Sequence, residues 1–202
     1  MANKDHTLDA KIVVAARNEF LKNGYQQASL HNIVKAAGLT TGALYTRYRG
    51  KDDLFCSLCQ PLLHEIEVRS KPIFERYLEV QHSNDPNLIL AAIHEEMLVF
   101  SKVLFDNYED CILLYCKSAG STIDKMINEM MDNKINSTIN YFKSIAKDDA
   151  GLEGVGALLT LQFHFFREIL LRGYSREQTM DALKIIYIYQ EAGWKAVFDE
   201  IF

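Results

Sequence analysis

The chain has 202 residues, of which only 3 are Pro and 10 are Gly, while 49% are hydrophobic and 24% are charged. So few turn-forming residues exclude a protein of many short strands, and the ordinary balance of apolar and charged residues excludes an extensively disordered chain. The formal net charge of −5 argues against a protein whose whole surface coats a polyanion.

The charge is unevenly distributed along the chain. Residues 1–55 hold 8 basic and 5 acidic residues, a net charge of +3, whereas the other 147 residues hold 14 and 22, a net charge of −8. This division predicts that only the N-terminal segment approaches a polyanion.

We expect no secretory signal and no membrane span. The apolar stretch at residues 12–16 is too short for the apolar region of a signal, and the longest uncharged stretch, residues 154–166, is shorter than the roughly 18–20 apolar residues that a spanning helix needs. The protein is therefore expected to be soluble and intracellular.

The N-terminal segment predicts three helices. The first covers residues 8–23, buries one apolar face and ends at Gly24. Ser29 can cap a second, short helix that ends at Gly38, and Thr40 can cap a third that runs through Tyr48. Two short helices joined by a turn of about three residues that contains Gly form a helix-turn-helix.

In such a motif the second short helix reads DNA, while phosphates bind to nearby donors and to the start of the next helix. The residues predicted to contact DNA are Ser29, Thr40, Thr41, Gly42, Tyr45, Thr46, Arg47 and Lys51. The alternative is a small helical subdomain without a ligand.

This segment resembles the DNA-binding domain of the tetracycline-repressor (TetR) family, over about a quarter of the chain. The resemblance rests on Gly24-Tyr25, Ser29, Ile33, Ala37-Gly38-Leu39-Thr40, Gly42, Leu44-Tyr45, Tyr48 and Lys51-Asp52-Asp53-Leu54-Phe55. The chain departs from the family pattern at Val34, Arg47, Tyr48 and Gly50. Arg47 matters most, because its planar fork binds a guanine edge or a phosphate more strongly than the usual His or Tyr.

From Leu54 the pattern predicts a long helix with an end or a kink at Pro61 and at Pro72, followed by a loop at residues 81–86. Further helices are expected over residues 87–106, 108–119, 122–146, 152–172 and 175–199. The predicted fold is thus all-α, with about nine helices in two domains: a helix-turn-helix domain at 1–53 and a helical effector-binding and dimerisation domain at 54–202.

The last two helices each carry two apolar faces, so one face can close the core while the other meets a second subunit in a four-helix bundle. The resemblance implies the same homodimer, and two-fold symmetry predicts an inverted-repeat operator. The residues predicted to form the dimer interface are Leu158, Leu161, Phe165, Ile169, Ile186 and Trp194.

Aromatic residues, Met and Cys along the middle helices pack in the core by default. The resemblance implies that some of them enclose a small-molecule effector instead. The predicted pocket residues are Met97, Phe100, Tyr108, Cys111, Tyr115, Phe163, His164 and Arg167.

The four Cys are too few for a secreted disulfide framework and are expected to be reduced. Cys56 and Cys59 lie one helical turn apart, with His64 nearby, but a redox motif would need a strand before the helix and a zinc site a fourth ligand. Ordinary packing is favoured, and a redox or metal role stays open.

The sequence thus predicts a TetR-like transcriptional repressor, a cytoplasmic homodimer that binds double-stranded operator DNA, responds to an unidentified small-molecule effector and needs no cofactor, metal or membrane. One alternative is a DNA-binding protein of the same fold that is regulated by a protein partner or by thiol chemistry. An enzyme is disfavoured, because the sequence contains no phosphate loop, nucleophile elbow, HExxH or dinucleotide fingerprint.

Overall fold

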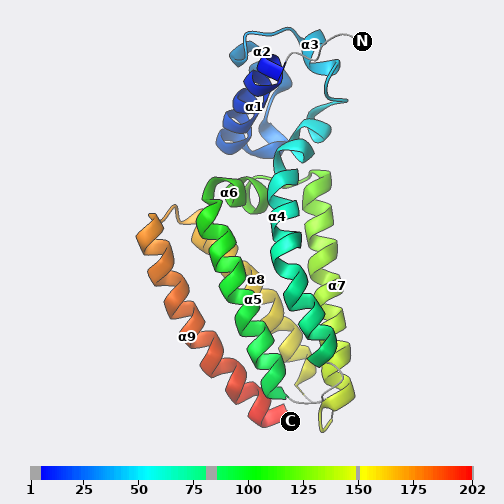
Figure 1. Cartoon of the computed structure of the whole chain (residues 1–202), viewed down its shortest axis with the longest axis vertical. Coiled ribbons are helices and arrows are strands. Elements are labelled where there is room, and N and C mark those ends of the chain that lie inside the picture. The colour runs from blue at the N-terminus through cyan, green and yellow to red at the C-terminus, as the bar shows by residue number, and fades with distance from the viewer. Residues whose placement is uncertain (1–5, 81–85, 149–150, 202) are drawn as a thin grey trace. The chain divides into compact units, whose positions relative to one another are not determined.

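A computed structural model describes residues 6–80, 86–148 and 151–201. Every regular element within these ranges is a helix (Figure 1). In chain order they are α1 (His6–Gln27), α2 (Leu30–Ala36), α3 (Thr41–Tyr45), α4 (Lys51–Val80), α5 (Pro86–Asp106), α6 (Tyr108–Cys116), α7 (Thr122–Ile145), α8 (Leu152–Leu171) and α9 (Arg176–Ile201). The predicted all-α fold with about nine helices is confirmed, whereas the loop predicted at 81–86 lies, up to residue 85, outside the described residues.

The chain divides into two compact units. The first unit comprises the described residues up to Leu63 together with Glu109–Asn128, and the second comprises His64–Tyr108 and the described residues from Glu129 onward. The first unit is therefore discontinuous in sequence. The predicted functional boundary between residues 53 and 54 stays a prediction.

The core of the first unit forms around α1, α2, α3 and the start of α4. Ile12, Phe20, Ile33, Leu44 and Phe55 are all fully buried. The Phe55 ring meets the Phe20 ring edge-on, with centroids 4.9 Å apart, and the Tyr25 ring at 5.2 Å. These apolar contacts hold the short helices, because helices of five to seven residues are not stable by themselves in water.

Polar contacts join residues 109–128 to the N-terminal helices of the same unit. The backbone N–H of Tyr25 donates to the carbonyl of Lys117 at 2.7 Å, next to Gly24, whose φ of 69° breaks the helical geometry of α1. Arg17 of α1 pairs with Glu109 and Asp110 of α6. The helical geometry of α1 thus breaks at Gly24, where the sequence predicted the end, although α1 as a whole runs on to Gln27.

The second unit is a bundle of α5, α8, α9 and the parts of α4 and α7 that belong to it (Figure 1). Its core cluster comes from α7, α8 and α9, and contains Phe142, Leu152, Val155, Leu159, Trp194 and Phe198. A Cβ atom at Gly156 would lie 2.9 Å from Cδ1 of Ile139, so Gly lets α8 approach α7 closely.

The helix α4 runs through both prolines, so the end expected at Pro61 or Pro72 is not found; the kink that was the other expectation stays a prediction. Proline removes one backbone donor and disfavours the helix around it. Pro61 and Pro72 are exposed, as are Ser57 and Val68, whose carbonyls lose that donor and can bind water. Buried neighbours on the opposite side, such as Leu62 and Ile73, keep the helix packed.

One described helix, α8, is long and apolar enough to cross a membrane by length and composition alone. This is weak evidence for a span, because a core helix of a soluble protein meets the same criteria. Leu152, Val155, Leu159, Ile169 and Leu170 of α8 are buried within the chain.

Candidate nucleic-acid interface

A tight turn joins α2 to α3. Gly38 adopts a φ of 68°, and the N–H of Leu39 donates to the carbonyl of Val34 at 2.9 Å, which closes the end of α2. The hydroxyl of Thr40 then accepts a hydrogen bond from the N–H of Ala43 at 3.2 Å and caps α3. Both sequence predictions, Gly38 as the left-handed residue and Thr40 as the cap, are confirmed.

The helix α3 buries one side chain fully and one partly, Leu44 and Ala43, and exposes its other three residues. Leu44 is fully buried, whereas Thr41 and Gly42 are exposed and Tyr45 is 55% exposed. An exposed Tyr is unusual in a small core-forming helix, and its hydroxyl can donate or accept at a phosphate or a base edge. Thr41, Gly42 and Tyr45 therefore form the surface that this helix offers to a partner.

Other predicted contact residues already have partners within the chain. The Thr46 hydroxyl donates to the carbonyl of Ala43 at 2.8 Å. Ser29 occupies the N-cap position of α2 but makes no side-chain cap hydrogen bond; its backbone N–H donates to the Glu19 carboxylate at 3.0 Å. Ser29 is therefore the N-cap residue, as predicted, but its side chain does not make the capping hydrogen bond; Glu19, ten residues earlier, holds this end through the Ser29 N–H and the Asn32 side chain.

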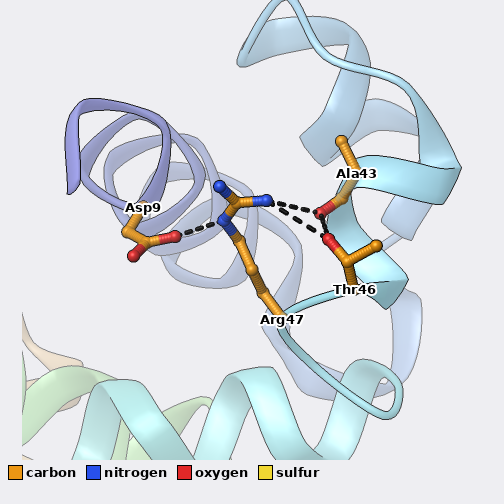
Figure 2. A network of polar contacts seen from close by, with 4 residues as sticks. All are labelled: Asp9, Ala43, Thr46 and Arg47. Atoms are coloured by element: carbon orange, nitrogen blue, oxygen red, sulfur yellow. Dashed lines mark hydrogen bonds and ion pairs between the residues drawn. The ribbon is translucent and has the colours of Figure 1, made fainter. Parts of the chain in front are cut away.

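Arg47 and Lys51 also turn toward the protein. Arg47 pairs with Asp9 of α1 and donates to the Ala43 carbonyl and the Thr46 hydroxyl (Figure 2). Lys51 Nζ donates to the carbonyls of Gln26 at 3.1 Å and Ala28 at 3.3 Å, and lies 4.7 Å from the centre of the Tyr25 ring. Their predicted contacts with DNA stay predictions, but each has a structural role that the sequence did not suggest.

Two carboxylates lie at the start of α4. Asp53 accepts the N–H of Arg49 at 2.9 Å, and Asp52 accepts the N–H of Thr122, at the start of α7, at 2.9 Å. Burial alone would raise the pKa of Asp52, but hydrogen bonds from Thr122, Tyr25 and Cys56 outweigh it, so the pKa lies below its usual value. The ionised form of Asp52 is therefore part of what connects α4 to α7 within the first unit.

We expect Asp52→Asn to remove a pH-dependent part of the stability. Because the pKa of Asp52 is lower in the folded state than in the unfolded state, its contribution is present above the unfolded value and is lost as the pH falls through the folded value. Urea unfolding across a pH series should show the wild type more stable than the variant above about pH 5 and the two converging in acid. A difference independent of pH would contradict this assignment.

Neither Cys of the 56/59 pair has the character of a reactive thiol. Burial raises the pKa of Cys59 to about 12, and burial together with Asp52 raises the pKa of Cys56. Both thiols are thus protonated near neutral pH, whereas redox chemistry and metal binding use the thiolate. Among the described residues, no three His, Cys, Asp or Glu side chains gather as metal ligands would.

The predicted pocket residues fall in both compact units. Met97 is buried, Phe100 packs near Phe166 with ring centroids 5.8 Å apart, and Tyr108 is half-buried, all in the second unit. His164 and Arg167 are exposed, and the side chain of Phe163 lies outside the described residues. Cys111, which is buried, and Tyr115, whose pKa is raised by burial, belong to the first unit. That these residues line one cavity stays a prediction.

The predicted interface residues differ in exposure. Leu158 and Leu161 are 37% and 52% exposed, and Phe165 and Ile186 are half-buried. Ile169 and Trp194 are buried within the chain, where Trp194 packs near Phe198 at a centroid distance of 5.8 Å. On α9 the exposed large apolar residues are instead Met180, Ile185, Ile188 and Tyr189. The helical period does not show which apolar face points outward.

These features define an all-helical protein whose N-terminal helix-turn-helix exposes one face of its second helix. A family model described as "Bacterial regulatory proteins, tetR family" matches residues 12–58, the stretch that contains the motif. The helix-turn-helix domain therefore belongs to the TetR family, and the chain as a whole has a TetR-like fold.

Solved structures agree with that fold. A TetR-like transcriptional regulator from Rhodococcus sp. RHA1 is 18% identical with a TM-score of 0.60, over 92% of this chain and 96% of that one. NalD, the secondary repressor of the MexAB-OprM multidrug efflux pump in Pseudomonas aeruginosa, is 18% identical with a TM-score of 0.53, over 91% and 95%. The fatty acid degradation regulator FadR from Bacillus halodurans is 17% identical with a TM-score of 0.50, over 92% and 96%.

Proposed function

We propose that the protein is a TetR-type transcriptional repressor that binds an inverted-repeat operator as a homodimer and releases it when a small molecule binds to its C-terminal domain. The observation that carries the proposal is the helix-turn-helix, in which the buried Leu44 anchors α3 while Thr41, Gly42 and Tyr45 face solvent. The similarity of the fold to a known repressor, NalD, supports the same role.

The surface formed by Thr41, Gly42 and Tyr45 of α3 suits DNA by size and by charge. It lies in a segment with a net charge of +3, although the chain as a whole carries −5. A helix of five residues reaches only a few base pairs, so discrimination requires a second copy in the next major groove. An inverted repeat with half-sites about one helical turn apart, or a multiple of that, is the operator that this geometry favours.

The exposed apolar residues of α8 and α9 support a homodimer. Leu158 and Leu161 on α8, and Ile185, Ile188 and Tyr189 on α9, are 37% to 66% exposed in the single chain. Soluble proteins bury such groups of side chains in interfaces, and the core of a homodimer interface is rich in apolar residues. Ile169 and Trp194 are buried within the protomer, so in this dimer they contribute to the interface by supporting, from the core, the helices that carry the exposed residues.

Effector binding is placed in the bundle of the second unit, with Met97, Phe100 and Tyr108 among the lining residues. Gln190, on α9 of the same unit, is a further candidate: it is 5% exposed, and its side-chain Oε1 has no hydrogen-bond partner among the described residues. A buried acceptor without a donor is costly, so a ligand or a water that donates to it is favoured.

Repression and release follow from linkage. A ligand that binds a conformation with the two recognition helices wrongly spaced for the operator lowers the affinity for DNA, and DNA lowers the affinity for the ligand by the same factor. Couplings of this kind are about 1–3 kcal/mol. The raised pKa values of Cys56 and Cys59 disfavour these two thiols as the source of the signal.

The direct test is binding to the DNA that flanks the protein's own gene, measured by fluorescence anisotropy at several salt concentrations. We expect the wild type to bind one segment specifically and Tyr45→Ala to lose about tenfold or more in affinity, because a base or phosphate contact is removed from each recognition helix. Met130→Ala is the control, since Met130 is 58% exposed on α7, outside the motif.

Binding of unrelated DNA with equal affinity, or equal affinity of Tyr45→Ala and the wild type, would contradict the proposal. Candidate effectors are then screened by melting temperature, which rises with a ligand that binds the folded state. A ligand that raises the melting temperature and lowers operator affinity supports effector control, whereas regulation by a protein partner predicts that no small molecule does both. A regulator of this type acts in the cytoplasm, where its DNA is.

A further inference from the structure

The side chain of Arg47 connects the recognition helix to α1. Its Nε donates to Asp9, and its Nη1 donates to the Ala43 carbonyl at 3.1 Å and to the Thr46 hydroxyl at 3.2 Å (Figure 2). Asp9 lies 38 residues earlier, in the first turns of α1. One guanidinium thus holds the C-terminal end of α3 and the N-terminal part of α1 together.

We propose that Arg47 is a positioning residue, which through Asp9 fixes the orientation of α3 on the domain and does not itself read the operator. The proposal rests on the DNA-binding function proposed above. It reassigns the side chain for which the sequence predicted a contact with a guanine edge or a phosphate.

The shortness of α3 explains why such a link is needed. The helix has five residues and one fully buried side chain, Leu44, so apolar packing alone fixes its orientation weakly. The bonds from Arg47 to Asp9 and to the Ala43 carbonyl provide a second attachment of α3 to the rest of the domain. Because Ala43 lies in the last turn of α3, where carbonyls lack helical donors, a cation there is also favoured by the helix dipole.

Burial and charge argue against a direct contact with DNA. The side chain of Arg47 is 13% exposed and that of Asp9 is 28% exposed, so the pair is largely withdrawn from water. To bind a phosphate, Arg47 would have to leave a carboxylate partly buried and unpaired, which is unfavourable. By contrast, Tyr45 is 55% exposed and needs no such rearrangement.

The sign of the effect of Asp9→Asn tests the assignment. If Arg47 positions α3 through Asp9, Asp9→Asn weakens operator binding by about tenfold, since two copies of the link are lost per dimer. If Arg47 contacts DNA and Asp9 merely competes for it, the same variant removes a negative charge near a polyanion and binds DNA equally well or more tightly.

A double-mutant cycle and a base-substitution scan complete the test. Arg47→Ala should also lose about tenfold, and the double variant Asp9→Asn/Arg47→Ala should be no weaker than the weaker single variant, because one link is removed only once. Asp9→Glu should restore binding to within about threefold of the wild type. Relaxed specificity at one operator position in Arg47→Ala would show a lost base contact and contradict the positioning role, whereas the sign of the Asp9→Asn effect separates positioning from a phosphate contact.

Melting temperatures of all variants check that they are folded at the assay temperature. If Arg47→Ala is unfolded there, Asp9→Asn and Asp9→Glu decide the question alone. Unchanged or tighter binding by Asp9→Asn, with specific binding by the wild type, would overturn the positioning role and leave the proposed function intact. Failure of the wild type to bind DNA specifically would instead overturn the proposed function.

Discussion

Phe55→Ala is expected to lower the free energy of unfolding by about 3–5 kcal/mol, the usual range for an aromatic residue removed from a core. Phe55 is fully buried, and its ring meets those of Phe20 and Tyr25, which also stack on each other with centroids 6.3 Å apart. These rings join α1 to the start of α4, so the loss should unfold the first unit at lower denaturant. Urea unfolding followed by circular dichroism measures the change.

Phe74→Ala is the matched control for this substitution. Phe74 lies on the same helix, α4, but is 63% exposed, so its removal should change the free energy of unfolding by less than about 0.5 kcal/mol. Similar losses for the two variants would mean that the aromatic cluster does not stabilise the fold as its geometry indicates.

Ile185→Asp is expected to convert the proposed dimer into monomers, raising the dimer dissociation constant by about 100-fold or more. In a two-fold interface each substitution occurs twice, so two carboxylates would be buried without partners. Ile185 is 66% exposed in the single chain, and the variant should therefore keep the wild-type fold. Light scattering after size exclusion, over a range of concentrations, measures the mass.

The control for the interface is Leu98→Asp, which places the same charge at a leucine that is 55% exposed on α5. This variant should remain dimeric. We further expect Ile185→Asp to bind a full operator no better than a single half-site, since one recognition helix acts alone. A dimeric Ile185→Asp variant would show that the apolar residues of α9 do not form the interface.

The sequence predicted well where the structure depends on neighbouring residues. Gly38 ends α2 and Thr40 caps α3 because left-handed φ values and N-cap hydrogen bonds are decided within a few residues. The residues 185–189, rich in β-branched side chains, are helical in α9, as the period of their neighbours indicated. The continuation of α4 through Pro61 and Pro72 depends on which of its residues pack in the core and which face solvent. The rule that proline ends a helix considers neither.

The candidate interface with DNA was predicted in outline and not in its contacts. The sequence indicated that Tyr45, next to the buried Leu44, is exposed; the exposure of Thr41 does not follow from the helical period, because Thr41 lies three residues before Leu44 and so on nearly the same face. The partner of Arg47 could not be predicted, because no spacing relates it to Asp9 on another helix. The same holds for Lys51, which donates to the backbone carbonyls of Gln26 and Ala28 at and just after the end of α1. Every residue has a backbone carbonyl, so no pattern in the sequence points to this contact.

The discontinuity of the first unit limits how this regulator can be cut and recombined. Residues 12–58 match the family model, but Leu113 and Leu114, which are fully buried, and the partners of Arg17, Tyr25 and Asp52 lie within residues 109–128. A chimera that grafts only the N-terminal helices onto another body would leave these groups without their counterparts. A transplantable DNA-binding module from this chain must therefore include the α6–α7 segment, or supply a host segment of matching charge and shape.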